Sequence, residues 1–352
     1  MIKKDEQFKL DLPTRRRIRV AAEDTITQSE IMTRAACPRK WFYRYALRLD
    51  RLAAFNPHLI YGSLMHSALA ELYSQEHYGL SPKEKYIEIP ELVLDEDMLL
   101  TPDNRYDLDI IKAKVQIAFD AYRWHYFEED KPLVVKGIEH DYLVAWKDLR
   151  LTGRIDMLAC PKKGDGVYIW DWKTAGRFDA SMLDAWSFRF QFLFYCWLYW
   201  RATGIRPSGI MVNGLQKSQL KPKIVNPKTK EKETAKEYLA RVKVNFRENR
   251  DKFFYRQRMP LAKGILLRFE EEMLAPHLDA YILMSKTNTD INTNVLGALT
   301  MAMNTGHCHV YNSFCEYLPL CQHGPIFLNE YKRREVKHKE LTTTEPELGE
   351  EG

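Results

Sequence analysis

The stretch from Gly153 to Lys173, GRIDMLACPKKGDGVYIWDWK, most constrains how this chain can fold. Apolar and polar side chains alternate before its centre, in LRLTGRIDML, and the part after it, VYIWDW, is β-branched and aromatic. Pro161, Gly164 and Gly166 between them mark a turn. The pattern predicts a β-hairpin, in which every second side chain of a strand lies on the same face.

The hairpin brings three chemically useful side chains together. Asp156 and Asp171 take neighbouring positions on the two strands, and Lys173 shares the strand face of Asp171. Two carboxylates this close repel each other unless a cation lies between them, and hard divalent ions such as Mg²⁺ prefer oxygen ligands. A lysine beside such an ion can orient a water molecule or help to deprotonate it. The sequence therefore predicts a site for metal-dependent cleavage of phosphodiester bonds.

The composition indicates one large globular domain. The 352 residues are 45% hydrophobic, and no long Pro/Gly/Ser-rich linker divides them. The net charge of +5 is too mild an excess to indicate a polyanionic partner by itself. The N-terminus lacks the apolar core of a signal peptide, and the longest apolar run, Phe190–Trp200, is about half a membrane span. We therefore expect a soluble, cytoplasmic protein without a membrane partner, and six cysteines are too few for a disulfide scaffold.

The hydrophobic periodicity predicts an α/β fold. Ser29 is interpreted as a helix N-cap, and Pro38 as the start of a second helix. An irregular insertion is expected over 81–107, and a further strand at 133–146 leads into the hairpin. Longer helices are expected at 60–78, 108–130, 181–203 and 264–287, and strands at 209–217 and, at a sheet edge, 252–259.

Four polar residues on these elements are candidates for the site. His66 lies at the edge of an apolar helix face, where a lone histidine is more often a packed side chain than a ligand. Gln191 and Tyr195 are one turn apart on a helix that is apolar nearly all round, so they either form an internal hydrogen bond or face the active cleft. Glu139 opens a strand, and we interpret it as a strand-edge charge rather than a ligand.

Two basic segments are candidates for nucleic-acid contacts. The first has cations interleaved with Trp41, Phe42 and other aromatic residues, which is also typical of an amphipathic helix. The second runs from residue 217 to 243 and is rich in lysine, which is also typical of a solvated loop. The candidate phosphate contacts are Arg39, Lys40, Arg44, Lys217, Lys221 and Lys223.

An ordered set of motifs resembles the RecB-like nucleases of the PD-(D/E)XK superfamily, in the iron–sulfur subgroup seen in phage exonucleases, AddB and CRISPR-adaptation nucleases. The motifs are Cys37-Pro, Gly62-x-x-x-His66, Gly153-Arg-Ile-Asp156, Asp171-Trp-Lys173, Gln191-x-x-x-Tyr195 and three late cysteines. The resemblance spans roughly residues 29 to 324. It implies a restriction-endonuclease-like fold, with a mixed central sheet flanked by helices.

The resemblance also implies roles for individual residues. His66, Asp156, Asp171 and the backbone carbonyl of Trp172 would bind Mg²⁺ or Mn²⁺. Lys173 would position or activate water. Gln191 and Tyr195 would form the Q-x-x-x-Y motif, which supports the site and the DNA near it.

The cysteines are interpreted as a second metal centre. A [4Fe–4S] cluster takes four thiolates, and the candidate ligands are Cys37, Cys308, Cys315 and Cys321. The cluster would join the N-terminal helical segment, 29–48, to the C-terminal cysteine segment, 305–324. Cys308 is the least regular in spacing. A zinc site that includes His307, His309 or His323 is an alternative, as are four unliganded thiols.

These observations predict a single nuclease domain over residues 25–336, with tails at 1–24 and 337–352. The expected activity is that of a metal-dependent DNA exonuclease in recombination, repair or phage DNA processing, which can also cut single strands. A CRISPR-type spacer-processing nuclease and a non-catalytic DNA-binding scaffold are the alternatives. Expected partners are single- or double-stranded DNA and a helicase, recombinase or single-strand-binding protein, in a bacterial cytoplasm or encoded by a phage.

Overall fold

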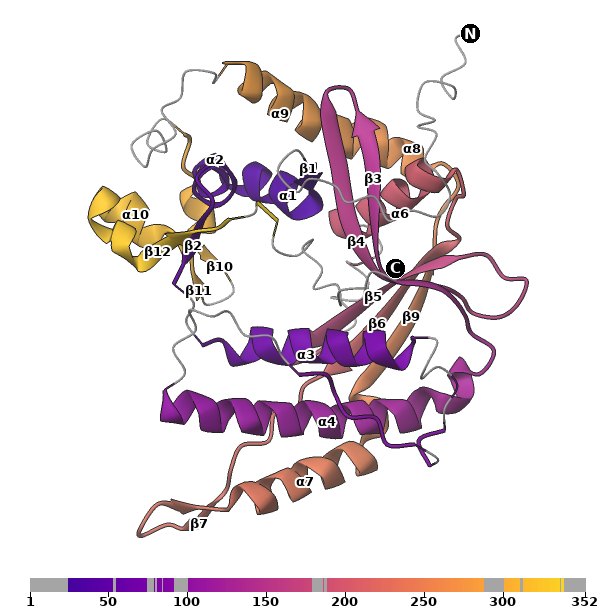
Figure 1. Ribbon diagram of the computed structural model, residues 1–352, viewed down its shortest axis with the longest axis vertical. Helices are drawn as coiled ribbons and strands as arrows, with labels where there is room; N and C mark the ends of the chain where they lie inside the picture. The colour runs from indigo at the N-terminus through magenta and orange to yellow at the C-terminus, as the bar shows by residue number, and fades with distance from the viewer. Residues whose placement is uncertain are drawn as a thin grey trace, which may run out of the picture.

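A six-stranded mixed sheet forms the centre of the molecule (Figure 1). The computed structural model describes residues 25–338 except 53–54, 75–78, 80, 84, 92–100, 179–185, 187–188, 288–300, 311–312 and 336. The path runs β1-β4-β5-β6-β9, and β3 pairs antiparallel with β4. The strands are β1 (Thr25–Thr27), β3 (Val134–Trp146), β4 (Leu149–Cys160), β5 (Tyr168–Ala175), β6 (Gly209–Gln216) and β9 (Phe254–Pro260).

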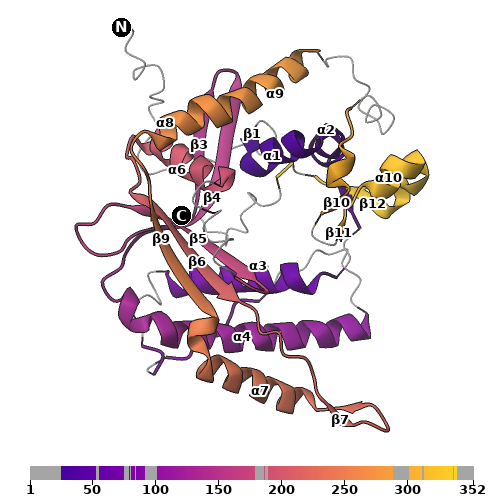
Figure 2. The ribbon, with the colours of Figure 1, turned by 180° about the vertical axis from the view of Figure 1, so that it is seen from behind.

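Helices cover both faces of the sheet, as expected for the restriction-endonuclease-like α/β fold (Figures 1 and 2). One face packs Trp170 and Trp172 against α3 (Pro57–Leu72) and α4 (Pro102–Asp130), with α7 (Ala235–Glu248) beyond them. The opposite face packs Ile169 against α6 and its neighbours. These are α1 (Gln28–Ala36), α6 (Phe190–Thr203), α8 (Ile265–Arg268), the π-helical segment η4 (Phe269–Leu274) and α9 (Ala275–Thr287).

A smaller core joins the two ends of the chain, beside the main sheet. Tyr43 stacks on Tyr317 with ring centroids 5.4 Å apart, and the Tyr317 hydroxyl donates to the Leu49 carbonyl. The N-terminal helical segment therefore packs against the C-terminal cysteine segment. Its elements are α2 (Pro38–Trp41), η2 (Phe42–Ala46), β2 (Leu49–Arg51), η6 (Thr305–His307), β10 (His309–Val310), β11 (Ser313–Phe314), α10 (Leu318–His323), η7 (Gly324–Glu330) and β12 (Tyr331–Arg333).

A fully buried carboxylate, Glu30, ties this region together. It accepts hydrogen bonds from Trp41 and Tyr281, and Lys337 and His338 approach its other oxygen at 2.9 and 3.2 Å. A buried charge is tolerated only when it is paired in this way. Lys337 and His338, the first two residues of the segment that we predicted as a C-terminal tail, therefore pack against the first helix.

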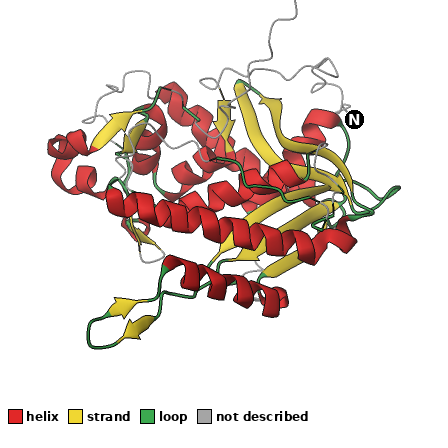
Figure 3. Ribbon diagram, turned by 60° about the horizontal axis from the view of Figure 1, so that its bottom comes forward, coloured by secondary structure: helices red, strands yellow, loops and turns green. Residues whose placement is uncertain are grey.

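Several predicted elements differ at their ends. Thr27, not Ser29, caps α1, because its side chain accepts from the Glu30 amide. The α4 helix starts at Pro102, inside the expected irregular insertion, since Thr101 provides an N-cap there. The basic segment after β6 contains a hairpin of β7 (Ile224–Asn226) and β8 (Glu231–Lys232), which projects beyond α4 and α7 (Figure 3).

Candidate active site

The site begins with an interruption along one edge of β4. At that edge β1 pairs with residues 150–152, and β5 pairs with residues 157–159. The pairing with β1 therefore ends at Thr152, and the pairing with β5 begins at Met157. The Tyr195 ring of α6 lies against Gly153, where a Cβ atom would be 3.0 Å from Tyr195 Cε1. A side chain at position 153 would therefore push the helix away from the strand.

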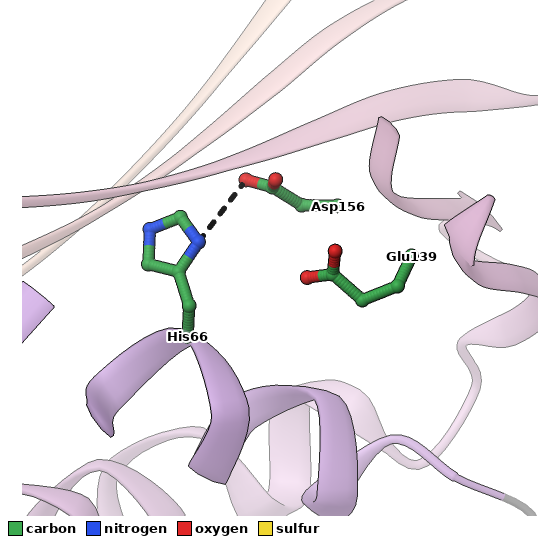
Figure 4. A group of neighbouring side chains, drawn as sticks. All are labelled: His66, Glu139 and Asp156. Atoms are coloured by element: carbon green, nitrogen blue, oxygen red, sulfur yellow. Dashed lines mark ion pairs between the residues drawn. The ribbon is translucent and has the colours of Figure 1, made fainter. Parts of the chain in front are cut away.

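Asp156 reaches into this opening. Its Oδ2 accepts a hydrogen bond of 2.7 Å from the Trp172 backbone amide, and it lies 3.9 Å from His66 Nδ1 (Figure 4). The Trp172 ring contacts the imidazole edge-on, with centroids 5.8 Å apart. The predicted approach of His66 to Asp156 is therefore present, and β5 holds both residues in place.

Glu139 is the third member of the group. The position of its side chain contradicts our interpretation of it as a strand-edge charge. Potential ligand atoms of His66, Glu139 and Asp156 all lie within 4.8 Å of one another. Glu139 has φ = 46°, a left-handed conformation inside a strand, and the β3 register shifts between Val135 and Gly137. Such an irregularity redirects a side chain. The strand register could have indicated Glu139, because its neighbours pair with those of Asp156.

Asp171 and Lys173 form the second half of the site. Asp171 is 2% exposed, and Lys173 Nζ lies 2.7 and 2.6 Å from its two carboxylate oxygens. The β4–β5 ladder ends with the pair Met157 and Trp170, so Asp156 and Asp171 are the next residue of each strand beyond it. The Lys173 ammonium also lies 5.8 Å from the centroid of the Phe192 ring on α6.

The acids destabilise one another's charge. Burial, followed by the neighbouring Asp156 carboxylate, raises the pKa of Glu139 to about 7. Burial also raises the pKa of Asp171 to about 6, and Asp156 adds to the rise while Lys173 opposes it. Three carboxylates and one imidazole form a donor set that suits a hard divalent cation, whose charge would offset their repulsion. The residues therefore fit the metal that the site chemistry requires.

The two residues of the Q-x-x-x-Y motif, Gln191 and Tyr195, lie on α6 beside β4. Gln191 and Tyr195 share a face of α6, and both are partly exposed, so Gln191 is not the buried glutamine that the apolar helix predicted. The Tyr195 ring lies against Gly153 of β4, and the Phe192 ring of the same helix lies beside the Lys173 ammonium.

The four candidate cluster ligands gather at the junction of the two chain ends. Cys37 is buried, and Cys308, Cys315 and Cys321 are partly buried. The pKa of the Cys321 thiol is raised to about 11, mainly by burial; Arg39 opposes the rise, and the charges of the other three cysteines add to it. The Cys315 amide donates to the Cys308 carbonyl at 2.8 Å, so Cys308 lies beside Cys315 despite its irregular spacing.

The two groups of candidate phosphate contacts differ in how far their cations are engaged by other residues of the protein. Lys40 and Arg44 approach Glu316 at 3.6 and 2.8 Å, and Arg39 donates to the Met301 carbonyl, so these cations contact the C-terminal segment. Lys217 donates to the His58 carbonyl. Lys221 and Lys223 are exposed.

An acidic cluster that could hold a metal ion, with an adjacent lysine in a mixed sheet between helices, is typical of metal-dependent nucleases. The family model of the PD-(D/E)XK nuclease superfamily matches residues 25–322, and the chain belongs to this superfamily. A comparison with curated proteins gave no match. Within the described residues, every helix is too short or too polar to cross a bilayer.

Proposed function

We propose that this protein is a DNA exonuclease that hydrolyses phosphodiester bonds with Mg²⁺ or Mn²⁺. The convergence of His66, Glu139 and Asp156, next to the Asp171–Lys173 pair, carries the proposal. The sequence resemblance to RecB-like nucleases supports the exonuclease mode and DNA as the substrate.

The residues of the site would have two roles, metal binding and the positioning of water. His66, Glu139, Asp156 and Asp171 would hold the cation, together with the Trp172 carbonyl. When bound, the ion lowers the pKa of water and stabilises the charge that develops on phosphate oxygens. Lys173 would orient the attacking water, because Asp171 holds its ammonium in the site. The Phe192 ring limits where that ammonium can move.

The DNA would reach this site along the basic side of the β5 and β6 ends. Lys217 follows β6 directly, and the exposed Lys221 and Lys223 continue the same segment. Contacts of this kind with phosphates provide affinity that is independent of sequence and sensitive to salt.

We further propose that Cys37, Cys308, Cys315 and Cys321 hold a [4Fe–4S] cluster that joins the two chain ends. Their proximity supports this assignment. Anaerobically purified protein should be brown and contain about four iron atoms per chain, and Cys321→Ala should lose both colour and solubility. Cys160→Ala, outside the group, is the control. A colourless, folded protein that contains zinc would refute the iron–sulfur assignment.

The activity test uses end-labelled and covalently closed circular DNA, single- and double-stranded, with Mg²⁺, Mn²⁺ or EDTA. A metal-dependent exonuclease should degrade linear DNA but not circular DNA, and should do so with Mg²⁺ or Mn²⁺ but not in EDTA. The end from which the label is released first reports the direction of degradation. Asp171→Ala should abolish cleavage, whereas Asp165→Ala, in the turn before β5, should not. Equal DNA binding without cleavage by both wild type and Asp171→Ala would refute the enzyme and favour a scaffold. Equal cutting of circular DNA would refute the exonuclease mode.

A further inference from the structure

A cleft of 640 Å³ opens beside the catalytic face of the sheet, and the residues assigned to metal and water above do not line it. Its floor lies where β5 and β6 end and β9 begins. The side chains that matter here are two cations, two amides and two aromatic rings: Arg177, Lys252, Gln216, Gln219, Phe178 and Tyr255.

The strand register relates the cleft to Lys173. Lys173 pairs with Gly214 on β6, and Gly214 pairs with Tyr255 on β9. Paired residues share a face of the sheet, so Tyr255 lies on the face of Lys173, two strands and roughly 10 Å away. Gln216 pairs with Ala175 on the same face, about 7 Å farther along the strand direction.

Gly214 leaves space for the two aromatic rings of the cleft, Phe178 and Tyr255. The Phe178 ring covers it, and a Cβ atom at this position would lie 2.9 Å from Phe178 Cζ. Phe178 in turn packs against Tyr255, with ring centroids 5.1 Å apart, and the Tyr255 hydroxyl donates to the Lys252 carbonyl. Phe178 is buried, whereas Tyr255 is partly exposed and can offer part of its ring to a ligand.

The polar groups of the cleft match a nucleotide. Gln216 Oε1 accepts from the Phe178 amide, and Gln219 Nε2 donates to the Gly176 and Lys217 carbonyls. This leaves the Gln216 NH₂ group as a donor and the Gln219 carbonyl as an acceptor, the two functions that a nucleobase edge requires. Arg177 and Lys252 are exposed cations, and none of the described residues that line the cleft is acidic.

We propose that this cleft binds one or two nucleotides of a single strand next to the phosphate that is cleaved at Lys173. Arg177 and Lys252 contact phosphates, and Tyr255 stacks on a base. The separation of roughly 7–10 Å between the cleft residues and Lys173 matches one to two nucleotides of an extended single strand. The inference rests on the proposed nuclease function. It places the path by which the single-stranded nucleic acid enters or leaves the site on the side of β9.

Binding in EDTA tests the proposal without cleavage. The probes are a fluorescein-labelled oligothymidine of about ten nucleotides and an abasic oligonucleotide of the same length, followed by anisotropy over a salt series. Arg177→Ala with Lys252→Ala should lower the slope of log affinity against log salt by about 1.4, from two single-strand phosphate contacts. Tyr255→Leu should weaken binding of the oligothymidine roughly fivefold or more and leave the abasic probe unchanged.

The matched control removes two exposed cations from the opposite end of β5, as Lys162→Ala with Lys163→Ala. Circular dichroism checks that Tyr255→Leu is folded, and the double cation variant tests the cleft without changing an aromatic contact. Equal affinities and salt slopes for the cleft and control variants would overturn the subsite, even if Asp171→Ala abolishes cleavage. Weaker binding by the cleft variants in a protein that never cleaves would instead support the subsite and refute the nuclease.

Discussion

Replacing Glu139 by glutamine should stabilise the metal-free protein and weaken its metal site. The pKa of Glu139 rises from an ordinary 4.5 to about 7 in the folded state. A carboxyl whose folded pKa is raised contributes stability that is complete below pH 4.5 and is lost as the pH rises through 7. Above pH 7 the ionised group therefore costs roughly 3 kcal/mol, at 1.36 kcal/mol per pH unit. Glutamine removes this cost because it carries no charge.

Thermal unfolding followed by circular dichroism, in EDTA and with Mn²⁺, measures both effects. In EDTA at pH 8 the Tm of Glu139→Gln should exceed that of wild type by roughly 5 °C, from the entropy of unfolding of a chain this long. At pH 4.5 the two should coincide. With Mn²⁺ the gain in Tm should be smaller for Glu139→Gln than for wild type, because a ligand is lost.

The control is Glu248→Gln, on the exposed end of α7, which should not change Tm at either pH. If Glu139→Gln were less stable than wild type in EDTA at pH 8, the cost of ionising Glu139 in its buried position beside Asp156 would be refuted. If Mn²⁺ stabilised both proteins equally, Glu139 would not be a ligand.

The other predictions concern the same site. Lys173→Met should lower the cleavage rate by roughly 10²–10⁴ while Mn²⁺ binding, measured by calorimetry, stays within about tenfold; a parallel loss of both would assign the lysine to metal binding. Apparent Mn²⁺ affinity should rise steeply between pH 6 and 7, since the pKa values of Asp171 and Glu139 are about 6 and about 7 and the ligands must be ionised; a flat profile contradicts this. Gly153→Ala should cost roughly 1–3 kcal/mol in urea unfolding through its contact with Tyr195, whereas Gly137→Ala, with 3.7 Å of clearance, should cost less than 1 kcal/mol.

The sequence predicted the candidate cluster cysteines, but only the structure shows how close the residues of the cysteine segment lie to one another. Residue spacing alone left Cys308 irregular, because ligand spacing along a chain does not determine distance in space. The stacking of Tyr43 on Tyr317 and the Cys315–Cys308 backbone bond bring the segment together. The cations after Cys37 show the converse. Their interleaving with aromatic residues suited a phosphate surface, but Glu316, 272 residues after Arg44, pairs with Arg44 and Lys40.

The sequence by itself determined the central hairpin and the neighbouring positions of Asp156 and Asp171, because the two-residue period of a strand places both carboxylates on one face once the turn is known. It also placed Lys173 beside Asp171 for the same reason. Only the tertiary structure decided that Glu139 joins them. A local distortion of β3 turns this side chain toward His66, and such a distortion depends on how three separate elements pack rather than on any periodic pattern.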